Sequence, residues 1–82
     1  MQLQNAIKRL NKQGYRVESK DDHFYEAILG DKIISFSRNG RSEEVIGFNV
    51  RRKDDVSDSM RDYFAGTMFS TLKSALLVMS NL

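Results

Sequence analysis

Apolar residues near both ends of the chain recur at helical spacing. Within residues 2–13, Leu3, Ile7 and Leu10 lie on one stripe of a helix, and Gly14 follows at a position where helices commonly end. A second run with this spacing comprises Met60, Phe64, Met68, Leu72, Ala75, Leu76 and Met79. The pattern therefore predicts one helix over 2–13 and another over about 58–80. It leaves open a kink or break in the second helix near Gly66, because glycine weakens a helix interior.

Between these helices, apolar residues come in short runs and alternations that are typical of strands. The runs cover residues 15–19, 23–29, 32–38 and 43–51. Gly30-Asp31 and Asn39-Gly40 are two-residue turn signals that join successive strands into hairpins. We therefore expect an α+β fold with the order α-β-β-β-β-α, in which both helices pack on one face of a four-stranded antiparallel meander. Residues 1–82 are expected to form a single compact domain.

The Gly30-Asp31 turn sets the register of the second and third strands. A two-residue turn pairs Ala27 with Ile34, which places both residues on the face that the helices are expected to cover. The predicted core comprises Leu3, Ile7, Leu10, Tyr15, Val17, Tyr25, Ala27, Ile34, Phe36, Ile46, Phe48, Val50, Phe64, Met68, Leu72 and Leu76.

The fourth strand needs an irregular connection to join this core. Ile46, Phe48 and Val50 alternate in a way that directs all three inward. A plain two-residue turn at Asn39-Gly40 would instead place Ile46 on the outer face. We therefore expect an odd-length loop or a bulge at this turn, with Gly40 at positive φ.

Composition limits the classes of protein that the chain can belong to. The 82 residues include no Cys, no Pro and one His, with 40% hydrophobic and 29% charged residues. This excludes a disulfide scaffold, a thiolate metal site and a cysteine nucleophile. The sequence shows no secretory signal and no apolar run of membrane-spanning length, so we expect a cytoplasmic protein without a membrane partner.

The sheet face away from the helices is the first candidate binding surface. It is expected to carry four large apolar side chains, those of Phe24, Ile28, Ile33 and Val45. A contiguous patch of this kind is typical of an interface, although scattered exposed apolar residues are common and the second helix could cover these. We expect a non-catalytic protein–protein interaction module that binds another protein, or a second copy as a homodimer, through this face or an edge strand. The size is compatible with a small regulator or inhibitor, including those carried by phage or mobile elements.

Basic residues provide the second candidate surface, within a net charge of +2. Five of them lie near the last two strands, at Arg38, Arg41, Arg51, Arg52 and Lys53, and another group comprises Lys8, Arg9, Lys12 and Arg16. Phosphate groups are bound by such side chains, so nucleic-acid binding is the alternative function. The plainer interpretation is solvated charge that keeps a small domain in solution.

The element order resembles, in topology alone, that of double-stranded-RNA-binding domains. The resemblance implies a basic N-terminus on the last helix, where that family contacts phosphates. Here the corresponding segment holds Asp54, Asp55 and Asp58, which would repel phosphates. This charge reversal excludes membership of that family.

Catalytic chemistry has little support in the sequence. His23 is the only imidazole, and the Asp21-Asp22-His23 segment is best interpreted as a polar turn that enters a strand. The acids at Asp54, Asp55, Asp58 and Asp62 lack the spacing of a calcium loop and suit a helix N-terminus. Because a Gly-rich phosphate loop and a nucleophile elbow are also missing, we expect no enzymatic activity, no cofactor and no bound metal.

Overall fold

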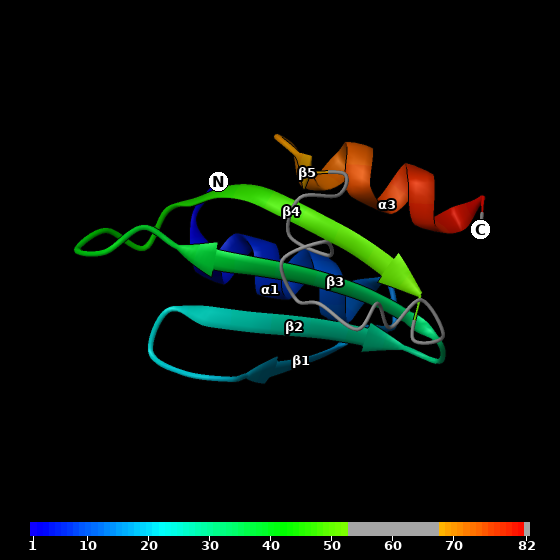
Figure 1. Ribbon diagram of the computed structural model, residues 1–82, viewed down its shortest axis with the longest axis horizontal. Helices are drawn as coiled ribbons and strands as arrows, with labels where there is room; N and C mark the ends of the chain where they lie inside the picture. The colour runs from blue at the N-terminus through cyan, green and yellow to red at the C-terminus, as the bar shows by residue number, and fades with distance from the viewer. Residues whose placement is uncertain (53–67, 82) are drawn as a thin grey trace, which may run out of the picture.

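Two helices and a five-stranded antiparallel sheet make up residues 1–52 and 68–81, the part of the chain that the computed structural model describes. The elements are α1 (Leu3–Lys12), β1 (Arg16–Ser19), β2 (Phe24–Leu29), β3 (Lys32–Arg38), β4 (Val45–Arg52), β5 (Met68–Phe69) and α3 (Leu72–Ser80). The strands lie in the order β1-β2-β3-β4-β5, so the sheet is a meander (Figure 1). The expected α+β fold is confirmed, and a fifth strand extends the sheet beyond the four that were predicted.

Both helices pack on the same face of the sheet, as predicted. In Figure 1, α1 lies behind the middle strands and α3 runs beside β4 and β5. One buried cluster joins the helices to this inner face, and its members are Leu3, Ala6, Leu10, Tyr15, Ala27, Ile34, Phe36, Val45, Phe48, Leu72, Ala75 and Met79. Burial of these side chains is the main source of stability for so small a sheet, because a sheet with one uncovered apolar face does not persist in water.

The β2–β3 hairpin has the predicted register. Ala27 pairs with Ile34 and Leu29 pairs with Lys32, which leaves Gly30 and Asp31 as the two turn residues. Gly30 adopts a φ of 61°, the left-handed conformation that such a turn requires and that glycine adopts without steric cost. The local sequence therefore fixes both the position of the turn and the face of every residue on these two strands.

A bulge in β4 changes which of its residues face the core. Phe48 pairs with Phe36 and Val45 pairs with Arg38, so three steps along β4 match two steps along β3. As a result Val45 is only 2% exposed within the core, whereas Ile46 is 66% exposed. The prediction that Ile46 belongs to the core is wrong, and the predicted inward orientation of Phe48 is confirmed.

The irregularity lies within the strand and not at the Asn39-Gly40 turn. Residues 39–44 form a loop that is closed by a hydrogen bond from the Asn39 amide to the Glu44 carbonyl at 2.8 Å. A β-turn inside the loop is held by the Ser42 amide, which donates to the Asn39 carbonyl at 2.9 Å. Gly40 does not have a positive φ, so the prediction of that conformation is wrong. A loop of this length reverses the chain without a residue at positive φ.

The short strand β5 occupies positions for which a helix was predicted. Phe48 pairs with Phe69 and Asn49 pairs with Met68, so these residues continue the sheet. Met68 is 61% exposed and lies over Gly47, where an added Cβ atom would come within 2.8 Å of the Met68 sulfur. The predictions that Met68 is helical and part of the core are therefore wrong. Pairing with β4 competes successfully with the helical spacing at this point.

The C-terminal helix begins later than the apolar spacing predicts. α3 covers Leu72–Ser80, and the side-chain oxygen of Thr71 accepts a hydrogen bond from the Ser74 amide at 3.2 Å as an N-cap. The predicted helix is thus confirmed for residues 72–80. The expected core residue Phe64 and the expected break at Gly66 lie outside the described residues.

Candidate binding site

Three of the four residues predicted for the apolar binding surface share the outer face of the sheet. Phe24, Ile28 and Ile33 lie there, opposite the helices. The prediction that Val45 joins them is wrong, because the β4 bulge rotates Val45 into the core. Exposure also differs within the set, since Ile33 is 6% exposed and Phe24 and Ile28 are half-buried.

These three residues do not form one contiguous apolar patch. Ile28 and Ile33 are direct cross-strand partners, but Phe24 pairs with Ser37 at the other end of the hairpin. The Glu26–Ser35 pair lies between the two groups and places a carboxylate in the middle of the face. The outer face is thus interrupted by polar residues where the sequence suggested a continuous surface.

Ion pairs satisfy the charges of this outer face internally. Arg51 contacts the Glu26 carboxylate at 3.0 Å, and Lys20 contacts it at 3.4 Å. Lys20 also donates to Glu18 at 3.2 Å, and the hydrogen bonds to Glu18 and then to Glu26 raise the pKa of Lys20. Charges that are already compensated offer little attraction to an outside partner, so this face is a weak candidate for electrostatic recognition.

Among residues 1–52, the basic residues predicted for nucleic-acid binding do not come together. Lys32 pairs with Arg52 and Arg38 pairs with Val45, so Arg38 and Arg52 lie at opposite ends of the β3–β4 ladder, about 20 Å apart along the strands. Arg52 contacts Asp31 at 3.5 Å, and Arg38 donates from Nε to the Asp22 carbonyl at 2.7 Å.

The other three predicted residues, Arg41, Arg51 and Lys53, differ in what the structure shows of them. Arg51 is held by Glu26, as described above, and Arg41 is exposed in the loop between β3 and β4. Lys53 lies outside the described residues. The structure therefore does not gather Arg38, Arg41, Arg51 and Arg52, the four members that it describes, into one surface.

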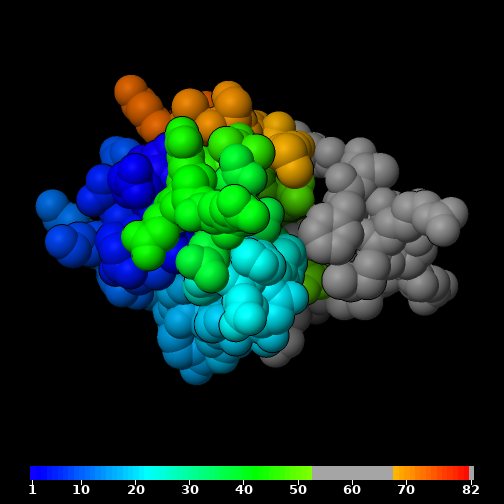
Figure 2. All heavy atoms as spheres, turned by 90° about the vertical axis from the view of Figure 1, so that its left-hand side faces the viewer, coloured from blue at the N-terminus to red at the C-terminus, as the bar shows by residue number. Residues whose placement is uncertain are grey.

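A different group of cations does form one surface, along the exposed side of α1. Lys8, Arg9 and Lys12 are exposed, and we call them the cationic face. Amide side chains fill the rest of this side, at Gln4, Asn5 and Asn11. The helix contains no acidic residue, and the ion pairs among residues 1–52 and 68–81 do not involve the cationic face. Figure 2 shows α1 along one flank of the molecule, beside the loop between β3 and β4.

The helical spacing of the sequence explains why these cations point outward. Leu3, Ala6 and Leu10 are buried against the sheet, positions 8 and 12 fall on the opposite side of the same helix, and position 9 falls on its flank. Backbone hydrogen bonds hold the start of α1 in place, because the Leu3 amide donates to the Glu43 carbonyl at 2.6 Å. At the other end Gly14, with a φ of 94°, terminates the helix as predicted. The cationic face is therefore presented by a fixed scaffold.

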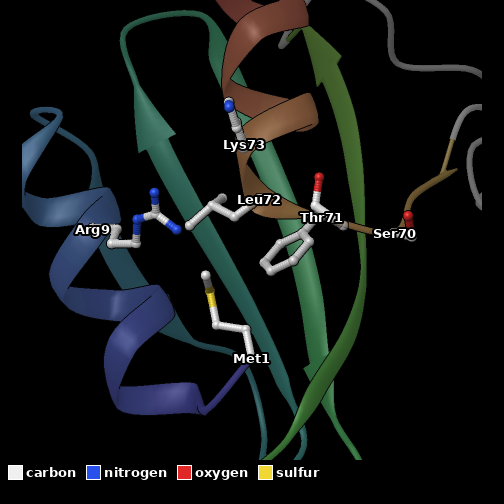
Figure 3. Close-up of a pocket in the computed structure, with 7 residues that line it drawn as sticks. Met1, Arg9, Ser70, Thr71, Leu72 and Lys73 are labelled. Atoms are coloured by element: carbon white, nitrogen blue, oxygen red, sulfur yellow. The ribbon is translucent and has the colours of Figure 1, made fainter.

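A cleft of about 340 Å³ lies between α1 and α3 at one end of the cationic face. Its apolar lining comes from Met1, Phe48 and Leu72, and its polar rim comes from Arg9, Ser70, Thr71 and Lys73. Figure 3 shows Arg9 reaching from α1 towards Leu72, with Ser70 and Thr71 on the other side of the cleft. We call this feature the α1–α3 cleft.

The two cations of the α1–α3 cleft come from different helices. Arg9 belongs to α1, and Lys73 lies in the first turn of α3, directly after the Thr71 cap fixes the start of that helix. Within residues 1–52 and 68–81, neither side chain forms an ion pair. The cleft thus combines an apolar lining with positive charge at its rim. In the sequence, this cleft is indicated by the lack of acidic residues in both helices. That lack does not show that Arg9 and Lys73 line the same cleft.

The Asp21-Asp22-His23 segment is a polar turn, as interpreted from the sequence. The Asp21 carboxylate accepts hydrogen bonds from the His23 amide at 2.7 Å and from the Phe24 amide at 2.8 Å. These bonds, that from His23 first, lower the pKa of Asp21 below its ordinary value of 3.8. The carboxylate therefore serves to shape the start of β2.

This turn gives the fold a defined response to acid. Because the folded pKa of Asp21 is depressed, its stabilising contribution is present above pH 3.8 and is lost as the pH falls through the lower folded value. Asp21→Asn keeps an oxygen acceptor but cannot titrate. Urea midpoints measured from about pH 5 to about pH 2 should fall less steeply for this variant than for the wild type. Equal slopes would show that the Asp21 carboxylate does not contribute to acid sensitivity.

Three further observations bear on function. In the described part of the chain, no group of three or more His, Asp or Glu side chains is arranged to hold a metal ion. None of the helices in that part is long and apolar enough to cross a membrane. Comparison of the chain with protein-family models, with curated proteins and with solved structures finds no match. The function can therefore be inferred only from the geometry of the chain itself.

Proposed function

We propose that the chain is a non-catalytic protein-binding module whose cationic face engages an acidic surface of another protein. The observation that carries the proposal is the separation of charge within the described residues. The acids Glu18, Glu26 and Asp31 pair with cations of the sheet, whereas Lys8, Arg9 and Lys12 pair with none of the described residues. Complementary charge steers partners together and selects among them, which suits a module of this kind.

The alternative of nucleic-acid binding has weaker support. Lys8, Arg9, Lys12 and Lys73 could neutralise four phosphates, which corresponds to a slope of about −4 in log affinity against log salt for duplex DNA. Typical duplex-binding proteins make more phosphate contacts than this, and the other predicted cations within residues 1–52 are dispersed or paired. Phe48 in the adjoining cleft is 1% exposed, so its ring offers no platform for an unpaired base.

A pair of charge-reversal variants tests the proposal. The probes are a labelled peptide in which Asp and Glu alternate with Ser, and a DNA duplex of similar total charge, with binding followed by fluorescence anisotropy at about 50 mM and about 200 mM salt. We expect the wild type to bind the peptide. Lys8→Glu/Lys12→Glu should weaken that binding about tenfold or more, because two attractive contacts become repulsive.

The matched control is Lys32→Glu/Arg41→Glu, which makes the same change in total charge at two positions outside α1. It should alter peptide affinity by less than about threefold. Equal losses in both variants would show that net charge and not the cationic face governs binding. Tighter binding of the duplex with a slope of about −4 or steeper would establish the nucleic-acid alternative, and failure of the peptide to bind the wild type would overturn the proposal.

A further inference from the structure

We propose that the α1–α3 cleft receives one apolar side chain of the acidic partner, while a neighbouring carboxylate of that partner contacts Arg9 and Lys73. This inference rests on the proposed function and specifies the sequence chemistry of the partner. The recognised segment is then an apolar residue next to an acidic residue, with further acids along the chain.

The shape and lining of the cleft support an apolar anchor. Its volume of about 340 Å³ lies at the lower end of the range in which proteins bind ligands, and it suits one large side chain with its adjoining backbone. Met1, Phe48 and Leu72 line it with carbon and sulfur atoms, and Met1 retains 36% exposure. Phe48 and Leu72 are each 1% exposed, so the gain from apolar burial comes from Met1 and from the partner's own side chain, which leaves water on entering the cleft.

The rim of the cleft supports a carboxylate next to that anchor. Arg9 and Lys73 line the cleft from separate helices, and neither forms an ion pair with the described residues. The Ser70 hydroxyl adds a polar atom at the same rim, whereas the Thr71 hydroxyl already donates to the Ser74 hydroxyl at 2.9 Å and accepts from the Ser74 amide at 3.2 Å. A lone apolar group would leave these cations without compensation, whereas an anchor with an adjacent acid satisfies both parts of the site.

Arg9 joins the cleft to the cationic face and therefore sets the arrangement of the partner. It lines the cleft and also lies one helical turn from Lys12 on the exposed side of α1. Residues three or four apart on a helix are neighbours, separated by about 5–6 Å. An extended segment with its anchor in the cleft can thus place further acids against Lys8 and Lys12.

Two peptides of equal charge test the inference. One carries a Leu next to an Asp in an acidic sequence, and the other has Ser in place of that Leu. The wild type should bind the Leu peptide about tenfold or more tightly than the Ser peptide, the gain expected when a large aliphatic side chain is buried. Ser70→Trp, at the exposed rim, should fill the cleft and reduce this preference to less than about twofold. Ser80→Trp places the same ring at the far end of α3 and should preserve the preference.

A second variant decides the question if Ser70→Trp fails to fold. Lys73→Gln should weaken binding of the Leu-Asp peptide more than binding of a Leu-Asn peptide, since only the first has a carboxylate at the rim. Equal affinity of the wild type for the Leu and Ser peptides would overturn this inference and leave the proposed function standing. Failure of the wild type to bind either peptide would overturn both this inference and the proposed function.

Discussion

Replacing Phe48 with alanine is expected to remove about 3–5 kcal/mol from the free energy of unfolding, which is close to the whole stability of so small a domain. Phe48 is 1% exposed and pairs across the sheet with Phe36, with ring centroids 5.7 Å apart. It also pairs with Phe69 on the other side and lines the α1–α3 cleft beside Leu72. Truncation therefore leaves a cavity where the sheet, β5 and α3 meet. Urea denaturation followed by circular dichroism should show a population that is partly unfolded without denaturant.

Ile46→Ala is the matched control for this experiment, because it truncates an aliphatic residue on the same strand. Ile46 is 66% exposed, so the change should alter the free energy of unfolding by less than about 0.5 kcal/mol. The comparison also tests the bulge, since a regular strand would direct Ile46 inward with Phe48. A loss above about 2 kcal/mol on Ile46→Ala would contradict the bulged register.

Removing the Glu26 carboxylate is expected to cost about 2–4 kcal/mol of stability. Its contacts with Arg51 at 3.0 Å and Lys20 at 3.4 Å lie on a face where the Glu26 and Arg51 side chains are only 13% and 19% exposed. Glu26→Ala would leave the Arg51 guanidinium without this carboxylate in a poorly solvated position. This expected loss of stability is smaller than that for a fully buried ion pair, because some solvent reaches both groups. Chemical denaturation of the variant measures it directly.

Asp31→Ala provides the comparison for an exposed ion pair of the same kind. Arg52 contacts Asp31 at 3.5 Å, and the two side chains are 46% and 45% exposed. Water screens this pair well, so its removal should cost no more than about 0.5 kcal/mol. Similar losses for Glu26→Ala and Asp31→Ala would show that burial does not distinguish the two pairs.

The sequence predicts those elements whose signals are local. Residues 2–13 contain both an apolar stripe and a terminating glycine, and the Gly30-Asp31 turn fixes the β2–β3 register without reference to the rest of the chain. The fourth strand differs because Val45 and Ile46 are both apolar. Either residue can complete an alternating pattern, and only the bulge, which depends on pairing with β3, decides between them.

The candidate site could be predicted only in part, for a related reason. The sequence groups Lys8, Arg9 and Lys12 as basic residues of one helix, but exposed cations on a helix normally remain solvated, so the group alone does not identify a binding surface. Their significance depends on which acids pair with other cations, and the Glu26–Arg51 pair joins residues that are distant in the chain. The α1–α3 cleft depends on contact between the two ends of the chain, which composition and periodicity do not report.

The hydrogen bonds that anchor the start of α1 have a consequence for how the domain folds. The Leu3 amide donates to the Glu43 carbonyl, and the Val45 amide donates to the Met1 carbonyl, so contact forms only after a long segment of chain has closed. The β2–β3 hairpin needs no such closure, and we expect it to form first. Helix docking then belongs to the late part of the reaction. Substitutions that weaken these hydrogen bonds should accelerate unfolding and leave the folding rate nearly unchanged. The bonds therefore control the lifetime of the native state and not the speed of its formation.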